Sequence, residues 1–356
     1  PKDRLYPDVY FKTEDELRLF TNQFYNNLVP SAVDIYSESS DLIVKSDLML
    51  EMSGQRIIPD EGNGWNFTAL RDINFYLQYS HNCTEVNARN RYDGVARFFR
   101  AYFYFEKVKR YGDIPWYDKA LDSDDPELYK ARDSREFVMQ KMLEDLDFAI
   151  ANLPKTKNAY VLTRWTALAL KSRVCLFEGT FRKYHGLEDC EKYLNACVSA
   201  SETFMNESGY TLYKSGSTPY RDLFASINLQ ADEVIFGRDY EASLSVLHNV
   251  QNYENSTTMG RPGMNKKIVN SYLMADGSRF TDKAGYETMT FDQECQNRDP
   301  RLAQTIRTPG YTRIGSTKKE APNLAYTMTG YHLIKYSMTA NYDEYNKSCN
   351  DIPLFR

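Results

Sequence analysis

Apolar residues recur at helical spacing through the first half of the chain. A capping box of Thr13 and Glu16 opens a helix whose apolar stripe falls at positions 17, 20, 24 and 28. Asp133 and Glu136 form a second capping signal, and the helix that follows them stops before Pro154. The same periodicity predicts further helices over residues 65–79, 87–111, 163–186 and 188–205.

The segment from Arg97 to Trp116 is the most aromatic part of the chain. Six aromatic residues fall within the eight positions from 98 to 105. A helix that is apolar nearly all round is buried between other helices. Gly112 followed by Pro115 is a C-terminal stop signal. We therefore expect a central helix that ends at Gly112 and continues as an extended segment.

A faint internal repeat relates two of the predicted helices. Residues 96, 99–101 and 103 match residues 167, 170–172 and 174 at an offset of 71 positions. That offset is close to twice the period of tetratricopeptide helix pairs. The small residues at 96, 101, 167 and 172 would let antiparallel helices approach closely. The pattern favours a mainly α fold built from tetratricopeptide-like helix pairs.

The pattern changes after about Gly209, where helical stripes shorten and turn residues multiply. Residues 234–240 and 331–336 alternate like strands, and residues 264–274 fit a short helix. Residues 31–64 give mixed signals and end in a loop over 60–64. We expect residues 1–210 to form a helical scaffold and residues 211–356 a loop-rich region packed on the same domain, because no Pro- or Ser-rich linker separates the two.

Charge and hydropathy exclude several classes of function. The chain has 44 basic and 49 acidic residues and a net charge of −5, so it lacks the basic footprint of a nucleic-acid-binding protein. The mean hydropathy is −0.61, and no apolar stretch approaches the length that spans a bilayer. The sequence contains no nucleophile-elbow, phosphate-loop or dinucleotide motif, and no two of its four histidines are spaced as helical metal ligands. We expect no metal site and no cofactor.

The six cysteines fit packed positions better than a disulfide framework. Cys190 and Cys197 lie two helical turns apart on one face of one helix, and Cys175 lies inside an apolar helix. No C-x-x-C pair occurs, and no histidine partner is apparent for a catalytic thiol. We expect structural thiols.

Tyrosine is unusually frequent, with 28 Tyr beside 19 Phe and 3 Trp. A tyrosine offers a flat apolar face and a polar tip, which suits a wet binding surface. Packing explains the aromatic residues inside helices. It explains less well the tyrosines in polar, glycine-containing stretches, at positions 253, 286, 311, 326, 331, 342 and 345.

Four segments in a fixed order carry a family resemblance. The helix of residues 97–111, ending in Tyr-Gly-Asp-Ile-Pro, and the alanine-rich helix of residues 163–178 are the first two. The Tyr-x-Met-x-Asp-Gly turn at 272–277 and the Arg-Asp-Pro-Arg-Leu segment within 297–310 follow. Together they resemble the SusD/RagB family of surface glycan-binding lipoproteins of Bacteroidetes-type bacteria.

The resemblance implies a location and a set of partners. A SusD-like protein holds four tetratricopeptide-like helix pairs and binds oligosaccharides or polysaccharides without cleaving them. It sits on the extracellular face of the outer membrane over a SusC-like TonB-dependent transporter, tethered by an N-terminal lipid on a cysteine upstream of this chain. In the family a segment like residues 351–356 leads into a last helix pair, so a C-terminal helical part is expected beyond Arg356.

Five residues are our candidates for glycan binding. Aromatic rings stack on the flat faces of sugars while amide and charged groups bind the hydroxyls. Trp65 and Asn66, in a polar glycine-containing stretch, match the place where SusD-like proteins often stack a tryptophan on glycan; alternatively, Trp65 only staples the start of its helix. Tyr286, Tyr311 and Tyr326 lie in the downstream region from which such proteins project their ligand loops.

Other conspicuous residues are expected to be structural. Trp116, Tyr117 and Trp165 fit the core. We expect a turn to be set by Tyr272, Asp276 and Gly277. We expect an internal ion-pair or cap network to be formed by Arg298, Asp299 and Arg301.

Two rival functions remain open. A tetratricopeptide-like scaffold that binds only protein or peptide would lack an aromatic platform. A helical glycoside hydrolase would carry two facing carboxylates beside its aromatic residues, and the sequence has acidic residues enough for that.

Overall fold

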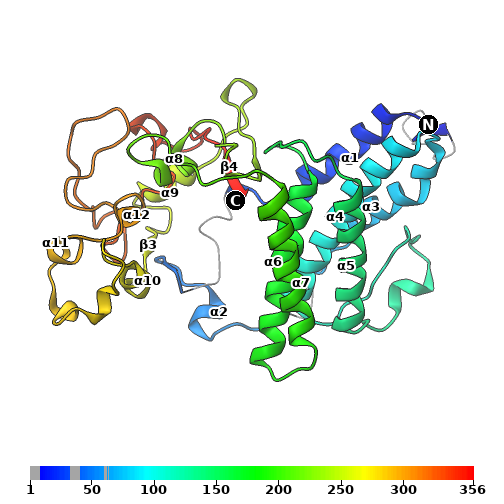
Figure 1. Ribbon diagram of the computed structural model, residues 1–356, viewed down its shortest axis with the longest axis horizontal. Coiled ribbons are helices and arrows are strands. Elements are labelled where there is room, and N and C mark those ends of the chain that lie inside the picture. Colours follow the sequence, from blue (N-terminus) through cyan, green and yellow to red (C-terminus); the bar gives the residue numbers. More distant parts are fainter. Residues whose placement is uncertain (1–8, 33–40, 60–61, 63) are drawn as a thin grey trace. The chain divides into compact units, whose positions relative to one another are not determined.

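The computed structural model describes residues 9–32, 41–59, 62 and 64–356 (Figure 1). The chain divides into two compact units. The first contains residues 1–29, 59–210 and 355, and the second contains residues 30–58, 211–354 and 356. The units meet in sequence at residue 210, next to the change in pattern at Gly209, while residues 30–58 belong to the second unit. Residues 60, 61 and 63 of the expected 60–64 loop lie outside the described residues.

The first unit is a stack of helices (Figure 1). Helices α4 and α5, α5 and α6, and α6 and α7 pack on one another in succession, and α1 packs on α3 and α4. The mainly α fold expected from the sequence is confirmed. The helices are α1 (Glu14–Leu28), α3 (Thr68–Tyr79), α4 (Val86–Tyr111), α5 (Arg135–Asn152), α6 (Arg164–Tyr184) and α7 (Cys190–Glu207), with 3₁₀ helices η3 (Ser80–Asn82) and η4 (Pro126–Tyr129).

Helix α4 is buried on nearly all sides, as its aromatic sequence predicts. Its buried residues include Phe98, Phe99, Phe103, Tyr104 and Phe105. It ends where expected, because Gly112 takes a positive φ of 70° that side chains disfavour.

The predicted helix starts are confirmed at two places and wrong at a third. Thr13 and Glu16 form their capping box, and Thr163 caps α6. The cap of α5 is Ser134 rather than Asp133, and its hydroxyl accepts from the Phe137 N–H. Asp133 lies one residue too early because its backbone pairs with Ile114 in an isolated bridge.

Helices α6 and α7 approach each other closely at Gly179. A Cβ atom at this position would lie 2.7 Å from the Leu194 side chain and 3.1 Å from the Leu194 backbone nitrogen. Only a residue without a side chain fits here, so Gly179 sets the spacing of this helix pair.

The second unit consists of short elements joined by long loops. Strand β1 pairs antiparallel with β3, with Ile43 opposite Met264, and β2 pairs with β4. Its strands are β1 (Ile43–Val44), β2 (Phe236–Arg238), β3 (Gly263–Met264) and β4 (Ile352–Phe355), and its α-helices are α2 (Leu50–Ser53), α8 (Pro219–Ala225), α9 (Val250–Glu254), α10 (Lys266–Ser271), α11 (Phe291–Glu294) and α12 (Pro300–Ala303). Its 3₁₀ helices are η5 (Ala242–Leu244), η6 (Phe280–Asp282), η7 (Tyr286–Thr288) and η8 (Ala340–Tyr342).

Residues 331–336 do not form the expected strand. His332 and Leu333 make only isolated bridges, to Gly263 and Ile306 respectively. Each neighbouring segment forms one bridge pair with these residues, so no continuous β-ladder forms. The strand expected at 234–240 shortens to β2, whereas the short helix expected at 264–274 is present as α10.

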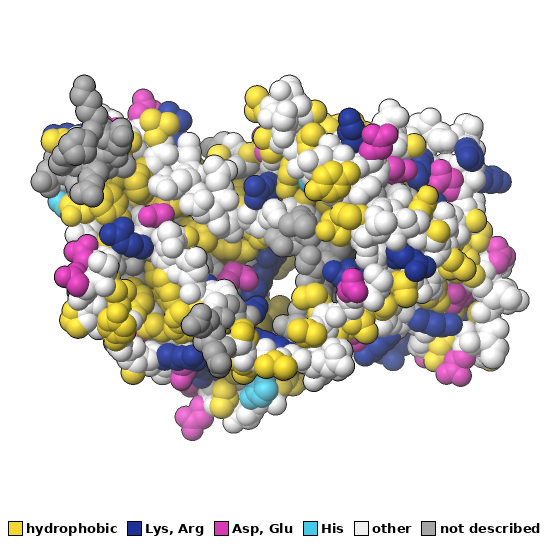
Figure 2. All heavy atoms as spheres, turned by 180° about the vertical axis from the view of Figure 1, so that it is seen from behind, with side chains coloured by type: hydrophobic (Ala, Val, Ile, Leu, Met, Phe, Trp, Pro, Cys, Tyr) yellow, Lys and Arg dark blue, Asp and Glu magenta, His cyan; other side chains and the backbone are white. Residues whose placement is uncertain are grey.

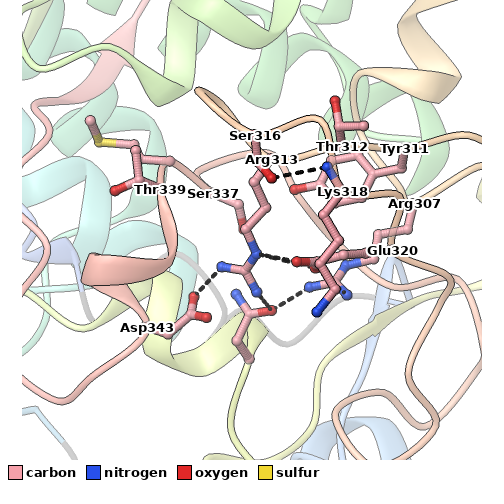
Figure 3. A network of polar contacts seen from close by, with 12 residues as sticks. Arg307, Tyr311, Thr312, Arg313, Ser316, Lys318, Glu320, Ser337, Thr339 and Asp343 are labelled. Atoms are coloured by element: carbon pink, nitrogen blue, oxygen red, sulfur yellow. Dashed lines mark hydrogen bonds and ion pairs between the residues drawn. The ribbon is translucent and has the colours of Figure 1, made fainter.

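A network of ion pairs around two buried arginines joins several loops of the second unit (Figure 3). Arg313 pairs with Glu320 at 3.0 Å and with Asp343 at 2.7 Å. Arg307 pairs with the other oxygen of Glu320 at 3.0 Å. Because buried charges are unfavourable unless paired, this network fixes the loops to one another.

The expected structural roles of several residues are confirmed. Arg298 donates to the backbone oxygens of Val269, Tyr272 and Glu294. Asp299 caps α12 and pairs with Arg301.

The expected turn is confirmed, and the expected burial of the thiols is confirmed in part. The Asp276 carboxylate accepts from the Ser278 N–H beside Gly277, whose φ is +86°. The six cysteines are free thiols; Cys83, Cys175 and Cys349 are buried, whereas Cys190, Cys197 and Cys295 are half-buried. Burial raises the pKa of Cys175 to about 12.

The surface charge is mixed. Figure 2 shows basic and acidic side chains scattered among apolar ones over one face of the described residues. None of the helices in the described ranges combines the length and apolar character that a membrane crossing needs. Within those ranges, no group of three or more His, Cys, Asp or Glu is placed to hold a metal ion.

Candidate functional site

A cleft of about 580 Å³ lies in the first unit, where the start of α3 faces the connection between α4 and α5. Residues between positions 65 and 74 form one side, and residues between 115 and 132 form the other. The expected site residue Trp65 lines this cleft, together with the rings of Phe67 and Tyr117.

Trp65 lies in the loop before α3, because that helix begins at Thr68 rather than at residue 65. Its ring packs edge-on against Tyr111 at 4.9 Å and Phe67 at 5.3 Å. The side chain remains 39% exposed, whereas Trp116 and Trp165 are 6% and 3% exposed. The expectation that Trp116 and Trp165 belong to the core is confirmed, and Trp65 is the tryptophan that a ligand can reach.

The loop that carries Trp65 is held from α4. Lys107 donates a hydrogen bond to the Gly64 carbonyl, and its ammonium also lies 5.8 Å from the Phe67 ring centroid. Burial lowers the pKa of Lys107. Gly64 adopts a φ of +81°, and a Cβ there would lie 3.4 Å from the Tyr111 hydroxyl. The Trp65 ring is therefore presented by a fixed turn.

Asn66 has a local structural role. Its Oδ1 accepts from the Thr68 N–H at 2.8 Å, which satisfies one of the free donors at the start of α3. It does not line the cleft.

Tyr117 lies beside Phe67 in the lining of the cleft, with ring centroids 5.8 Å apart. The Tyr117 N–H donates to the Tyr104 hydroxyl at 2.6 Å, and the Tyr117 hydroxyl donates to the Leu128 carbonyl at 3.3 Å. Burial raises the pKa of Tyr117. The residue is buried, as expected, yet it also forms part of the cleft wall.

The α4–α5 connection is tied to α3 by side-chain hydrogen bonds. Asn74 is buried, and its Nδ2 donates to the carbonyls of Tyr117 at 2.9 Å and Lys119 at 3.3 Å. Arg71 Nε donates to the Leu121 carbonyl at 3.1 Å. Two residues of one helix thus fix the opposite wall, so the cleft has a defined width.

Four cationic side chains line the cleft: Arg71, Lys119, Lys130 and Arg132. Lys119 pairs with Glu127 at 2.8 Å, and Lys130 pairs with Asp133 at 2.9 Å. The Arg132 guanidinium lies 5.0 Å from the centroid of the Trp65 ring. At this distance a cation and an aromatic face attract each other.

The three expected tyrosines of the second unit lie in different surroundings. Tyr286 lines a separate cleft of about 570 Å³ with Lys267 and Arg279, and its ring packs edge-on against Phe280. Tyr326 is half-buried, with its ring 6.2 Å from that of His332.

Tyr311 is only 7% exposed, and Arg221 donates to its hydroxyl at 3.3 Å. A ring so covered has no open face for a sugar, so we assign Tyr311 to the packing of the second unit.

The cleft contains residues that the sequence did not single out, above all Phe67, Asn74 and Arg132. The sequence does show two cations, Lys130 and Arg132, in the loop between two predicted helices. Assigning these cations to the cleft requires knowing that the loop passes Trp65, and this follows only from the helix packing.

Two family models match the chain. One, described as "SusD family", matches residues 201–356, and the other, described as "Starch-binding associating with outer membrane", matches residues 53–164. A curated relative, SusD-like protein P38 of Formosa agariphila, is 29% identical over 87 residues. That match spans 24% of this chain and 17% of the relative.

Solved structures share the fold. A SusD-like protein from Bacteroides fragilis NCTC 9343 is 20% identical, with a TM-score of 0.73 over 98% of this chain and 73% of its own. A SusD-like carbohydrate-binding protein from the same strain is 16% identical, with a TM-score of 0.75 over 97% and 72%. A structure with xylogluco-oligosaccharide is 17% identical, with a TM-score of 0.64 over 96% and 68%.

The sequence resemblance and these comparisons agree. The two family models match separate stretches in the two halves of the chain, and the structural likeness extends over nearly its whole length. This chain belongs to the SusD/RagB family.

Proposed function

We propose that this protein binds oligosaccharides in the cleft beside Trp65 and does not cleave them. The observation that carries the proposal is the partly exposed Trp65 ring, which lines a cleft together with the rings of Phe67 and Tyr117. Aromatic residues combine a large apolar face with low conformational freedom, which suits them to stack on the CH faces of a sugar ring.

The fixed geometry of the cleft supports this proposal. Asn74 and Arg71 hold the opposite wall, and Lys107 holds the loop that carries Trp65. A site that is ordered before the ligand arrives loses less conformational entropy on binding. A few stacked rings in an open cleft bury limited area, so we expect modest affinity.

We further propose that the protein works at the extracellular face of the outer membrane, held there by an N-terminal lipid. There it would deliver bound oligosaccharides to a SusC-like TonB-dependent transporter. The family description that includes association with the outer membrane supports this location.

Calorimetric titration with a panel of oligosaccharides tests the binding. We expect at least one to bind, and Trp65→Ala to weaken that binding about tenfold or more, because it removes a stacking surface. The matched control is Tyr184→Ala, since Tyr184 is an exposed aromatic residue that does not line the cleft. Equal effects of the two substitutions would overturn the assignment of the site.

Other outcomes would favour the rival functions. New reducing ends during the incubation would identify a glycoside hydrolase. Failure to bind any member of a broad panel would favour a scaffold for proteins or peptides.

The transporter is tested separately. The full-length protein should co-purify from detergent-solubilised outer membranes with a TonB-dependent transporter, and recovery without one would contradict the proposed delivery.

A further inference from the structure

The cleft beside Trp65 is rich in hydrogen-bond donors and poor in acceptors. Arg71, Lys119, Lys130 and Arg132 line it, and among the described residues that line it there is no aspartate or glutamate. Guanidinium and ammonium groups donate only. A neutral sugar must donate from its hydroxyls as well as accept, and carboxylates are the strongest acceptors a protein offers for that purpose.

Asn74 and Tyr117, two of the neutral polar side chains that line the cleft, are already engaged. The buried Asn74 uses its Oδ1 to accept from Arg100 at 3.2 Å and its Nδ2 to donate to two carbonyls. The Tyr117 hydroxyl donates to the Leu128 carbonyl. These two groups hold the walls together, so recognition of a ligand falls largely to the four cations, with the Thr68 hydroxyl beside them.

The four cations differ in how far protein carboxylates neutralise them. Lys119 and Lys130 have carboxylates at 2.8 and 2.9 Å. Arg71 is anchored through Nε to the Leu121 carbonyl, and its Nη2 lies 3.9 Å from the exposed carboxylate of Asp122, beyond hydrogen-bonding distance.

Arg132 is the least neutralised of the four. It is exposed, and within the described ranges it has no ion pair; its one described interaction is with the Trp65 ring. No hydrogen bond within the described ranges engages its N–H groups, so they remain able to donate to a ligand.

These observations concern the ligand of the site proposed above and rest on that proposal. We infer that the cleft selects anionic oligosaccharides, in which a sugar ring stacks on Trp65 while a carboxylate or sulfate group binds Arg132 and Arg71. The chemistry shared by these ligands is an acceptor-only group of negative charge. The planar guanidinium fork fits a carboxylate with two parallel hydrogen bonds, and it also binds the oxygens of a sulfate ester.

Matched ligands test the inference directly. Oligouronates are titrated into the protein beside the same oligosaccharides after reduction of their carboxyl groups, which leaves ring and linkage unchanged and removes the charge. Sulfated oligosaccharides and their desulfated forms make a second pair. We expect the charged member of at least one pair to bind about tenfold or more tightly, and the pair that shows the difference identifies the anionic group.

Two further readouts concern the protein. Arg132→Gln should abolish most of the preference, because it should weaken binding of the charged ligand far more than binding of its neutral counterpart. Arg18→Gln, which removes an exposed arginine of α1 that pairs with Asp15, is the matched control and should preserve the preference. Raising the salt concentration about tenfold should weaken binding of the charged ligand but not of the neutral one, because salt screens exposed charges.

The outcomes separate this inference from the proposed function. Equal affinity for charged and neutral members of both pairs, with loss of both on Trp65→Ala, would overturn the inference and leave glycan binding intact. A preference that survives Arg132→Gln and Arg71→Gln would also overturn it. If no ligand of either kind binds, both fall together.

Discussion

Arg100 on α4 and Asp145 on α5 form a buried, two-point ion pair in the first unit. Arg100 Nε lies 2.7 Å from Asp145 Oδ2, and its Nη2 lies 2.8 Å from Oδ1. The remaining terminal nitrogen, Nη1, donates to Asn74 Oδ1 at 3.2 Å. Since Asn74 also holds the Tyr117 carbonyl, one buried network joins the packing of three helices to the wall of the cleft.

We predict that Asp145→Asn destabilises the protein by about 3–5 kcal/mol, because it leaves the Arg100 charge buried without its partner. Urea unfolding followed by far-ultraviolet circular dichroism measures the effect. Asp147→Asn is the matched control on the same helix, where an exposed carboxylate pairs with Lys171, and it should cost at most about 1 kcal/mol. Similar losses in the two variants would contradict the prediction.

Gly179→Ala should destabilise the first unit by about 1–3 kcal/mol, because its Cβ would overlap the Leu194 side chain. The same unfolding experiment checks this. Adding Leu194→Ala should recover part of the loss, since it removes the overlapping atoms. Lys183→Ala, on an exposed position of the same helix, is the control and should change little. A stabilised Gly179→Ala variant would show that the helix pair can relax.

His248 and His332 are both buried in the second unit and have the same hydrogen-bond pattern. In each, Nε2 donates to a backbone carbonyl, of Asn350 and Glu254 respectively. In each, Nδ1 accepts from a backbone N–H. A neutral ring satisfies both bonds, whereas protonation of Nδ1 would break the second. Burial therefore lowers the pKa of His248 from 6.5 to about 4.

At His332, burial together with the Arg307 charge lowers the pKa from 6.5 to about 3. Below pH 6.5 the unfolded chain takes up a proton on this residue that the folded chain does not. Its contribution to stability is therefore present above that pH and is lost as the pH falls. The free energy of unfolding should fall about 2 kcal/mol more between about pH 7 and pH 5 for the wild type than for His332→Gln.

Chemical unfolding at a series of pH values measures this difference in slope. Carboxylates contribute equally to both proteins, so the comparison isolates the histidine. His81→Gln, at an exposed position, is the control and should keep the wild-type slope. Parallel curves for the wild type and His332→Gln would refute the prediction.

Trp65 should dominate the quenching of tryptophan fluorescence by acrylamide, because Trp116 and Trp165 are buried. Trp65→Phe should remove most of the quenchable emission, and a bound oligosaccharide should protect the wild type by covering the ring. Unchanged quenching in Trp65→Phe would mean that another tryptophan becomes exposed in solution. Trp165→Phe serves as the control and should leave the quenchable emission intact.

Much of the first unit follows from local rules in the sequence. Three features of the first unit each depend on residues within a few turns of one another. They are the caps at Thr13 and Thr163, the end of α4 at Gly112 and the aromatic residues around α4. The error at Asp133 has a tertiary cause, because its carboxylate accepts from the N–H of Trp116, a residue of the extended segment. Local rules cannot include a partner that lies across the fold.

The candidate site was only partly predictable, for the same reason. Tyr311 and Tyr286 both lie in polar, glycine-containing stretches, yet one ring is covered by Arg221 and the other lines a cleft. Nothing in the residues beside them distinguishes the two, because burial depends on which distant segment packs over a ring.

The sequence by itself determined the mainly α class and the family, and it made Trp65 a candidate site residue, because periodicity, caps and short motifs are properties of neighbouring residues. Only the tertiary structure brought Arg71 of α3 and Arg132 of the α4–α5 connection to the cleft that holds Trp65. Those residues meet because α4 and α5 pack side by side and Asn74 ties the intervening chain to α3, and such long-range contacts follow from the packing of the whole helical unit.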